Sequence, residues 1–333
     1  MLTTALIAIS PQRPDGSLST QEANDLTFTA LSDPANQVAA KLGIVTAPAG
    51  DVRAATSTPT TRPAPRSARS SPRSPRSASR PCPCPVSAPV SAPVSAPPWA
   101  GYCGRMSLSS AWEDHANEWI AWARTSAHDG FWRGTWPALR ALLPEPGPGP
   151  VIDVGCGEGR GARELLKLGH QVIGVERSPT LAAAAVAASP GLPVLLGDAA
   201  ALPVASESAD LVLACMSLLD MDDFDGAVSE IGRVLRPGGQ LCMAVVHPLV
   251  TAQDDETIHA KTFQVSRPYL EQRRYVDAVD RDGLAMTFIS MHRPLSAYTS
   301  ALFANGMVIT ALTESGAGAV PWLLTLRADK IPH

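Results

Sequence analysis

The sequence of 333 residues is poor in aromatic residues and in long apolar segments. Aromatic side chains make up 5% of it, and none lies between Phe28 and Trp99. No apolar run approaches the ~20 residues of a membrane-spanning helix, so we expect no membrane partner. The start, residues 1–9, is apolar, but no basic residue precedes this stretch and Pro11 follows it, which makes it a poor secretion signal.

Cysteine is also scarce: the six cysteines are too few and too irregularly spaced for a disulfide scaffold. Cys156, Cys215 and Cys242 lie inside apolar runs, which is typical of reduced, buried thiols. We therefore expect a cytoplasmic protein, and we expect no metal site.

A general excess of positive charge is missing as well, since 27 Lys and Arg face 31 Asp and Glu. Residues 1–105 hold ten of the basic and five of the acidic side chains, so residues 106–333 are clearly acidic. A nucleic-acid partner is therefore not expected for the part that can fold.

Twelve of the 31 prolines fall between Val52 and Trp99, among Arg, Ser and Ala and a threefold Val-Ser-Ala-Pro repeat. Such a segment buries too little apolar surface to offset its ordering entropy. We predict that residues 1–105 form a disordered tail. Two alternatives stay open: a basic arm for RNA or anionic surfaces, or a true start at Met106.

Residues 106–149 are expected to form a helical cap. Five of the seven tryptophans lie between residues 112 and 136. In one expected helix over 111–124, aromatic residues recur at i, i+3, i+7 and i+10 and share a face: Trp112, His115, Trp119 and Trp122. This stripe is either a core face or an aromatic lid over a ligand. In the second case His115 and Trp119 would contact the acceptor.

From residue 150 onward, short apolar segments alternate with helical patterns. Expected strands cover residues 151–154, 171–175, 193–196, 209–214 and 240–246, and expected helices cover 160–167, 180–188 and 224–235. Two further strands, 307–313 and 322–327, are expected to pair antiparallel at the sheet edge. This order predicts an α/β domain over residues 150–333 with a doubly wound, mostly parallel sheet of seven strands.

A glycine-rich turn follows the first of these strands. Gly155, Gly157 and Gly159 let the backbone approach a ligand closely. Glu176 ends the next strand, where a carboxylate can accept both hydroxyls of a ribose. This spacing also fits a dinucleotide fingerprint, so an NAD-dependent oxidoreductase is one alternative. A pyrophosphate would bring negative charge to Asp153 and Glu158, however, and these acids favour a cationic ligand.

Four ordered segments resemble class I S-adenosylmethionine-dependent methyltransferases, closest to the small-molecule, ubiquinone-biosynthesis-like branch called methyltransferase type 11. They are Val151 to Gly159, Glu176, Gly197 to Pro203 and Val234 to Gly239. The resemblance covers about residues 150–248. It implies a Rossmann-like sheet, S-adenosylmethionine as cofactor and a small-molecule acceptor.

The resemblance implies that one set of residues binds the cofactor: Asp153, Gly155, Cys156, Gly157, Gly159, Glu176, Arg177, Asp198, Ala199, Cys215 and Met216. Plainer interpretations exist for two of them. Asp198 can be a helix cap, and Glu176 can be a surface acid paired with Arg177. Asp153 is expected to orient the loop, or a water near the cofactor's amino group, rather than to do chemistry.

The acceptor side is less defined. Methyl transfer by in-line displacement needs alignment, and a base where the nucleophile carries a proton. His247 ends the fifth strand and is a candidate base, with a structural histidine as the alternative. The segment 215–220 is expected to lie beside the adenosyl group. Residues 249–304 are expected to form a substrate lid in which Tyr269, Arg293 and Tyr298 contact the acceptor.

That lid is expected to contain strands at 262–265, 275–279 and 285–289 and a helix at 294–304. No Asn/Asp-Pro-Pro-Tyr motif follows the fourth strand, which argues against methylation of exocyclic base amines. Oxygen, nitrogen and carbon acceptors all stay open, and the sequence does not indicate an oligomeric state. A non-catalytic module that binds S-adenosylmethionine is a further alternative.

Overall fold

The computed structural model describes residues 106–125, 128–253, 265, 267–318 and 320–332, and the strands β1 (Ala8–Ser10) and β2 (Ala30–Ser32), which pair in parallel. The rest of the expected tail, residues 1–105, lies outside the described residues. So does the strand expected at 262–265, apart from Val265. Within the described part, no helix is long and apolar enough to cross a membrane.

A seven-stranded sheet with the order β10-β11-β7-β6-β3-β4-β5 forms the centre of the protein. Its strands are β3 (Val151–Val154), β4 (Val172–Glu176), β5 (Val194–Leu196), β6 (Ala209–Cys215), β7 (Leu235–Val246), β10 (Met307–Ser315) and β11 (Leu323–Lys330). Strands β3 to β7 are parallel, whereas β11 and β10 are antiparallel to their neighbours. The predicted fold class is confirmed. Because β3 pairs with both β4 and β6, the strand order reverses there, which is where open α/β sheets bind ligands.

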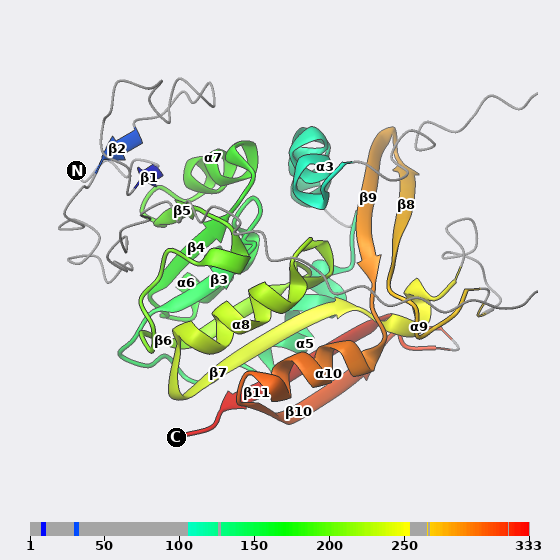
Figure 1. Cartoon of the computed structure of the whole chain (residues 1–333). Helices are drawn as coiled ribbons and strands as arrows, with labels where there is room; N and C mark the ends of the chain where they lie inside the picture. The colour runs from blue at the N-terminus through cyan, green and yellow to red at the C-terminus, as the bar shows by residue number, and fades with distance from the viewer. Residues whose placement is uncertain are drawn as a thin grey trace, which may run out of the picture. The chain divides into compact units, whose positions relative to one another are not determined.

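Helices cover both faces of this sheet (Figure 1). On one face, α8 (Phe224–Val234) and α10 (Leu295–Ala304) contribute to the same buried cluster as Ile152 and Val154. On the other face lie α5 (Trp136–Arg140), α6 (Arg160–Lys167) and α7 (Pro179–Ala188). Burial on both faces explains why the central strands read as continuous apolar runs rather than as alternating ones.

The N-terminal cap differs from its prediction, because the expected helix over 111–124 is two helices. They are α3 (Leu108–Asp114) and α4 (Ala116–Arg124). The break is at His115, whose backbone leaves helical geometry and whose ring contacts Glu118 at 2.8 Å. Ser107 caps α3 by accepting a hydrogen bond from the Ser110 N–H, so the first helix begins earlier than expected.

Within the predicted lid, β8 (Arg273–Arg281) and β9 (Leu284–His292) form an antiparallel hairpin separate from the main sheet. Asp282 and Gly283 turn it, both with positive φ (53° and 76°), as tight hairpin turns require. Strand β9 packs against α3 and α4, and the hairpin and α3 stand side by side beyond the sheet (Figure 1). The remaining helices are α9 (Pro248–Thr251) and short turns η2 (Phe131–Thr135), η3 (Ala199–Ala201) and η4 (Leu218–Asp220).

Candidate functional site

A cavity of about 520 Å³ lies at the carboxyl ends of β3 to β6. The sheet side of the cavity, which we call the loop wall, is formed by the glycine loop and the strand ends. The opposite side, the aromatic wall, comes from α3, α4 and the β8–β9 hairpin. Of the residues expected to bind a cofactor, ten line this cavity: Asp153, Gly155, Cys156, Gly157, Glu176, Arg177, Asp198, Ala199, Cys215 and Met216. Gly159 instead starts α6, in left-handed geometry.

The glycine loop needs its glycines for two different reasons. Gly155 has a φ of 68°, and a Cβ there would lie 2.6 Å from the Ser217 Cβ. Ser217 occupies this place because its hydroxyl donates to the Val154 carbonyl at 2.6 Å. Gly157 has a φ of 57° and faces the Trp119 indole across the cavity, 3.5 Å from where its Cβ would be. The first glycine therefore allows the loop to pack, and the second leaves the cavity open.

Gly155→Ala is expected to weaken binding of an adenosyl ligand more than about tenfold, because the new Cβ must displace Ser217 or the loop. Gly238→Ala is the matched control. Its φ is 76°, but nothing lies within 4 Å of its Cβ and it is remote from the cavity. Thermal melting should report backbone strain in both variants, whereas calorimetry should report lost affinity only in the first. Equal affinities would contradict this role for Gly155.

Glu176 connects the glycine loop to β4. Its Oε2 accepts a hydrogen bond from the Gly157 N–H at 2.8 Å, and Oε1 accepts from the Arg177 and Ser178 N–H groups at 2.9 Å. The side chain is buried, and burial raises the pKa of Glu176, although these three bonds oppose the rise. Glu176 is thus not a surface acid paired with Arg177. The carboxylate shapes the loop and faces the cavity.

Asp198 combines the two roles that the sequence left open. Its Oδ1 accepts from the Ala200 N–H at 3.0 Å and so caps η3, while the residue also lines the cavity. Its Oδ2 accepts a hydrogen bond from Arg177 at 2.7 Å. The cap holds the carboxylate at the cavity rim, so capping and ligand binding do not exclude each other.

Asp153 is the least satisfied polar group of the loop wall. It is buried inside β3, and its Oδ2 has no hydrogen-bond partner among the described residues. Burial, with a further contribution from the charge of Glu176, raises the pKa of Asp153 to about 7. Buried oxygens of this kind normally find a partner. The residue itself lines the cavity. The position fits a cationic group, or a water that such a group holds.

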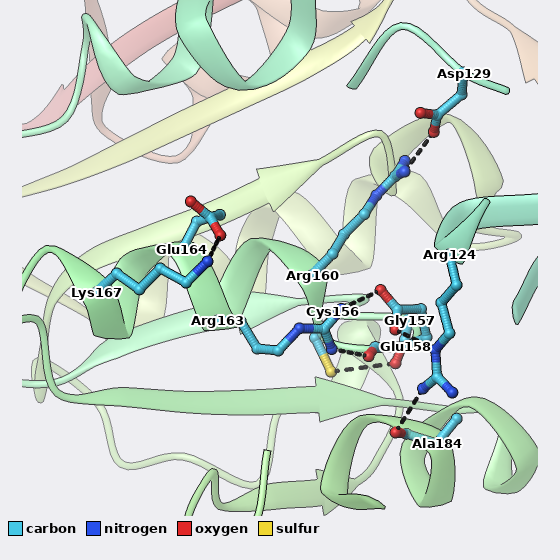
Figure 2. A network of polar contacts seen from close by, with 10 residues as sticks. All are labelled: Arg124, Asp129, Cys156, Gly157, Glu158, Arg160, Arg163, Glu164, Lys167 and Ala184. Carbon is cyan, nitrogen blue, oxygen red and sulfur yellow. Dashed lines mark hydrogen bonds and ion pairs between the residues drawn. The ribbon is translucent and has the colours of Figure 1, made fainter. Parts of the chain in front are cut away.

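The negative charge of Glu158, in contrast, is already balanced by two arginines. Its buried carboxylate contacts Arg124 at 3.1 Å and Arg163 at 2.6 Å, and Arg124 also donates to the Ala184 carbonyl (Figure 2). This network joins α4, the loop and α7. The expectation that Glu158 selects a cationic ligand is therefore not supported by its surroundings, which leaves Asp153, whose Oδ2 has no partner among the described residues, for that role.

Arg160 supplies a positive charge to the same cavity. Its guanidinium is paired with Asp129, which lies across from it in Figure 2. It also lies over the rings of Trp119 and Phe131, 4.7 and 4.1 Å from their centroids. Stacking of this kind fixes a guanidinium in place, so Arg160 joins the loop wall to the aromatic wall.

The aromatic wall is built around Phe288 of β9. Trp112, Trp119 and Trp122 surround its ring edge-on, with centroids 6.4, 6.0 and 6.3 Å away, and all four residues line the cavity. The three tryptophans of the stripe therefore pack the helices on the hairpin, and they also line the cavity. Phe288 itself had no sequence signal beyond its place in an expected strand.

Three of the expected acceptor contacts do not belong to the described lining of the cavity. His115 contacts Glu118 at the break between the helices. The Tyr269 hydroxyl accepts from the Leu295 N–H at 3.0 Å. Tyr298 is buried with its ring edge-on to Phe224, 5.3 Å away. His115 was expected there because it shares a helical face with the tryptophans, and the two tyrosines because they lie in the predicted lid. Trp119 is the candidate of that stripe that does line the cavity.

Arg293 is also outside the described lining, but it supports it. Its guanidinium donates to the carbonyls of Leu218 at 3.1 Å and Met221 at 2.7 Å, which are the first residue of η4 and the residue that follows it. The cation lies over the Phe224 ring, 4.6 Å from its centroid. Arg293 thus fixes the turn that follows β6.

His247 is a structural histidine in its observed contacts. Its Nδ1 accepts from the Leu249 N–H at 3.1 Å and caps α9, so Nε2 carries the proton and donates to Glu314 at 2.7 Å. Both ring nitrogens are engaged, and His247 is absent from the described lining. A role as base has no support in this geometry.

Comparison with known proteins finds a family model that matches part of the chain. Residues 152–243 match the family model described as "Methyltransferase domain". "Methyltransferase GfsG" of Streptomyces halstedii is 35% identical over 40% of this chain and 52% of its own length. "Malonyl-[acyl-carrier protein] O-methyltransferase" of Enterobacter lignolyticus is 32% identical over 36% of this chain and 47% of its own length. The chain spans about half the length of these curated relatives.

A solved structure agrees on the fold. The putative S-adenosylmethionine-dependent methyltransferase of Listeria monocytogenes is 22% identical, covers 60% of this chain and 97% of its own, and has a TM-score of 0.50. The glycine loop, Glu176 and Asp198 all lie on one cavity wall within or beside the matched segment. Residues 152–243 therefore match a methyltransferase domain, and the sheet around them has the fold of S-adenosylmethionine-dependent methyltransferases.

Proposed function

We propose that this chain transfers a methyl group from S-adenosylmethionine to a small-molecule acceptor bound between the two walls of the cavity. The observation that carries the proposal is the unpartnered Asp153 Oδ2, which shares one wall with Glu176 and Asp198. Carboxylates there suit a ligand with a cationic end and a ribose.

When bound, the cofactor supplies an electrophilic methyl group on a sulfonium. Glu176 would accept hydrogen bonds from the ribose hydroxyls, and Asp198 from the adenine amino group. Gly157 leaves room for close approach of the backbone. Asp153 would hold the ammonium group directly or through water. These roles leave the aromatic wall for the acceptor.

The aromatic wall would align the acceptor for in-line displacement. Trp112, Trp119 and Phe288 offer flat apolar surface opposite the glycine loop and exclude water from the reacting atoms. Holding the reactants in one geometry supplies much of the rate, because methyl transfer needs little covalent help from the protein. The similar proteins are named for unlike acceptors, so the lining of the cavity is the better guide to the class of acceptor.

The first test is calorimetry of the full chain with S-adenosylmethionine, S-adenosylhomocysteine and NADH. We expect both adenosyl ligands to bind in the micromolar range and NADH to give no signal. Binding of NADH alone, or silence from both adenosyl ligands in a folded sample, would overturn the proposal. Binding without methyl transfer to any acceptor tried would favour a non-catalytic module.

A further inference from the structure

One carboxylate of the cavity faces the acceptor side and has no part in the proposed binding of the cofactor. Asp220 ends η4, five residues after β6, and lines the cavity. Its described hydrogen bond is to the hairpin: the Ser290 hydroxyl donates to Asp220 Oδ1 at 2.5 Å. A residue after the sheet and a residue of the lid thus meet inside the cavity.

The backbone that presents Asp220 is tightly constrained. Met216, just after β6, has a φ of 57°, an unusual conformation for a residue with a side chain. Ser217 then contacts the glycine loop through Val154, and Arg293 holds the carbonyls around η4. Strained and over-determined positions of this kind gather at functional sites.

The two acidic residues that lie just after Asp220 in the sequence form hydrogen bonds at the starts of helices. Asp222 accepts from the Leu108 N–H at 2.9 Å at the start of α3, and Asp223 caps α8 through the Gly226 N–H at 2.9 Å. Asp220 caps no helix. It is half-buried, so part of its surface stays open to the cavity.

The surroundings of Asp220 are apolar and aromatic. Tyr275 lies directly opposite Ser290 in the hairpin and is buried. Trp112, Leu219 and Phe288 also line the cavity. A flat, largely apolar molecule fits this surface, and the carboxylate is a single polar point that accepts a hydrogen bond.

From this juxtaposition we infer that Asp220 binds the proton-bearing oxygen or nitrogen of an aromatic acceptor, such as a phenol or an arylamine, and takes its proton during methyl transfer. This inference rests on the proposed function. Ser290 is a positioning residue: its hydroxyl holds one carboxylate oxygen of Asp220.

The lone pair of the acceptor oxygen or nitrogen forms the bond to the methyl carbon, the carbon–sulfur bond breaks, and its electron pair stays on sulfur. The acceptor's proton passes to Asp220 and later to solvent. A neutral phenol thus leaves as its methyl ether without an oxidant or a metal.

The protonation state of Asp220 depends on groups from several elements. Burial raises its pKa to about 8, and the charge of Glu176 on β4 adds to the rise. Ser290 of β9, Trp112 of α3 and the charge of Arg293 oppose it. The base form is therefore scarce below pH 8, and acceptor binding through it should strengthen as pH rises through that value.

The test uses 2-naphthol and its methyl ether, 2-methoxynaphthalene, which share a ring and differ in the O–H donor. Calorimetry on the full chain saturated with S-adenosylhomocysteine, at pH 8.5, should show the naphthol binding at least about tenfold more tightly. Asp220→Asn should abolish this preference and leave the affinity for S-adenosylhomocysteine unchanged. Asp280→Asn, an exposed position of β8 outside the described cavity lining, should keep it.

With S-adenosylmethionine present, transfer to 2-naphthol should fall at least about 100-fold in Asp220→Asn, as for loss of a general base. Equal binding of naphthol and ether to the wild type, a preference retained in Asp220→Asn, or no transfer to the bound naphthol would each overturn the inference. A failure of S-adenosylhomocysteine to bind would instead overturn the proposed function. The two failures are thus distinguishable.

Discussion

Glu176→Ala is expected to lower the affinity for S-adenosylhomocysteine by about 100-fold, the equivalent of roughly 3 kcal/mol. Two effects combine in this value. The variant loses the acceptor for the ribose hydroxyls, and it also releases the glycine loop, since the Gly157 N–H loses the carboxylate that holds it at 2.8 Å. Asp198→Ala should cost less, because its carboxylate is half-exposed and its cap supports only the short turn η3.

Calorimetry with S-adenosylhomocysteine measures both variants, and Glu176→Gln separates the two effects. Glutamine keeps one acceptor oxygen, so it should retain part of the loop geometry and bind between wild type and alanine. Glu164→Ala, which removes an ion pair with Lys167 on α6, serves as the control and should bind normally. Unchanged affinity in both Glu176→Ala and Asp198→Ala would refute the assigned cofactor site.

Asp153→Asn is expected to stabilise the protein at alkaline pH while weakening its cofactor binding. Burial raises the pKa of Asp153 from its ordinary 3.8 to about 7, so the folded state holds this proton more tightly than the unfolded state. The stability that the protonated side chain contributes is complete below pH 3.8 and is lost as pH rises through about 7. Asparagine never ionises, and the variant should gain about 2–4 kcal/mol over wild type above that pH.

Thermal melting at pH 4 and pH 8 measures this difference. The gain should be close to zero at pH 4 and reach several degrees, roughly 5–10 °C, at pH 8. Asp280→Asn, with an exposed carboxylate, should show no such dependence. A gain that is equal at both pH values would contradict the assigned pKa. A stabilised variant with poor cofactor affinity would show that the site sacrifices stability for binding.

The loop wall could be predicted from the sequence because its signals are local. A short buried strand followed by a glycine turn places Gly155 at one edge of the sheet. Glu176 and Asp198 come at the ends of the next two strands and therefore lie at the same edge. The mostly parallel sheet follows from the alternation of apolar and helical segments, and the antiparallel closing pair from two apolar segments near the end of the chain. The break between α3 and α4 was harder to predict, because nothing in the 3.6-residue pattern shows that His115 interrupts the expected helix over 111–124.

The aromatic wall could be predicted only in part, because long-range contacts decide it. Phe288 reaches the tryptophans through the packing of β9 on α3 and α4, which no spacing reveals. Arg293 and His247 carry typical binding chemistry, yet Arg293 holds η4 and His247 caps α9. Asp220 becomes notable only when Ser290, 70 residues later, donates to it.

The two walls of the cavity also have different origins along the chain. The loop wall lies within the matched residues 152–243, whereas α3, α4 and the β8–β9 hairpin lie before and after them. If the proposed function holds, changes in these flanking segments would alter the acceptor and leave the residues that face the cofactor unchanged. A chimera that exchanges both segments together for those of another methyltransferase would be the natural unit for redirecting such an enzyme, since Phe288 and the tryptophans pack as one cluster.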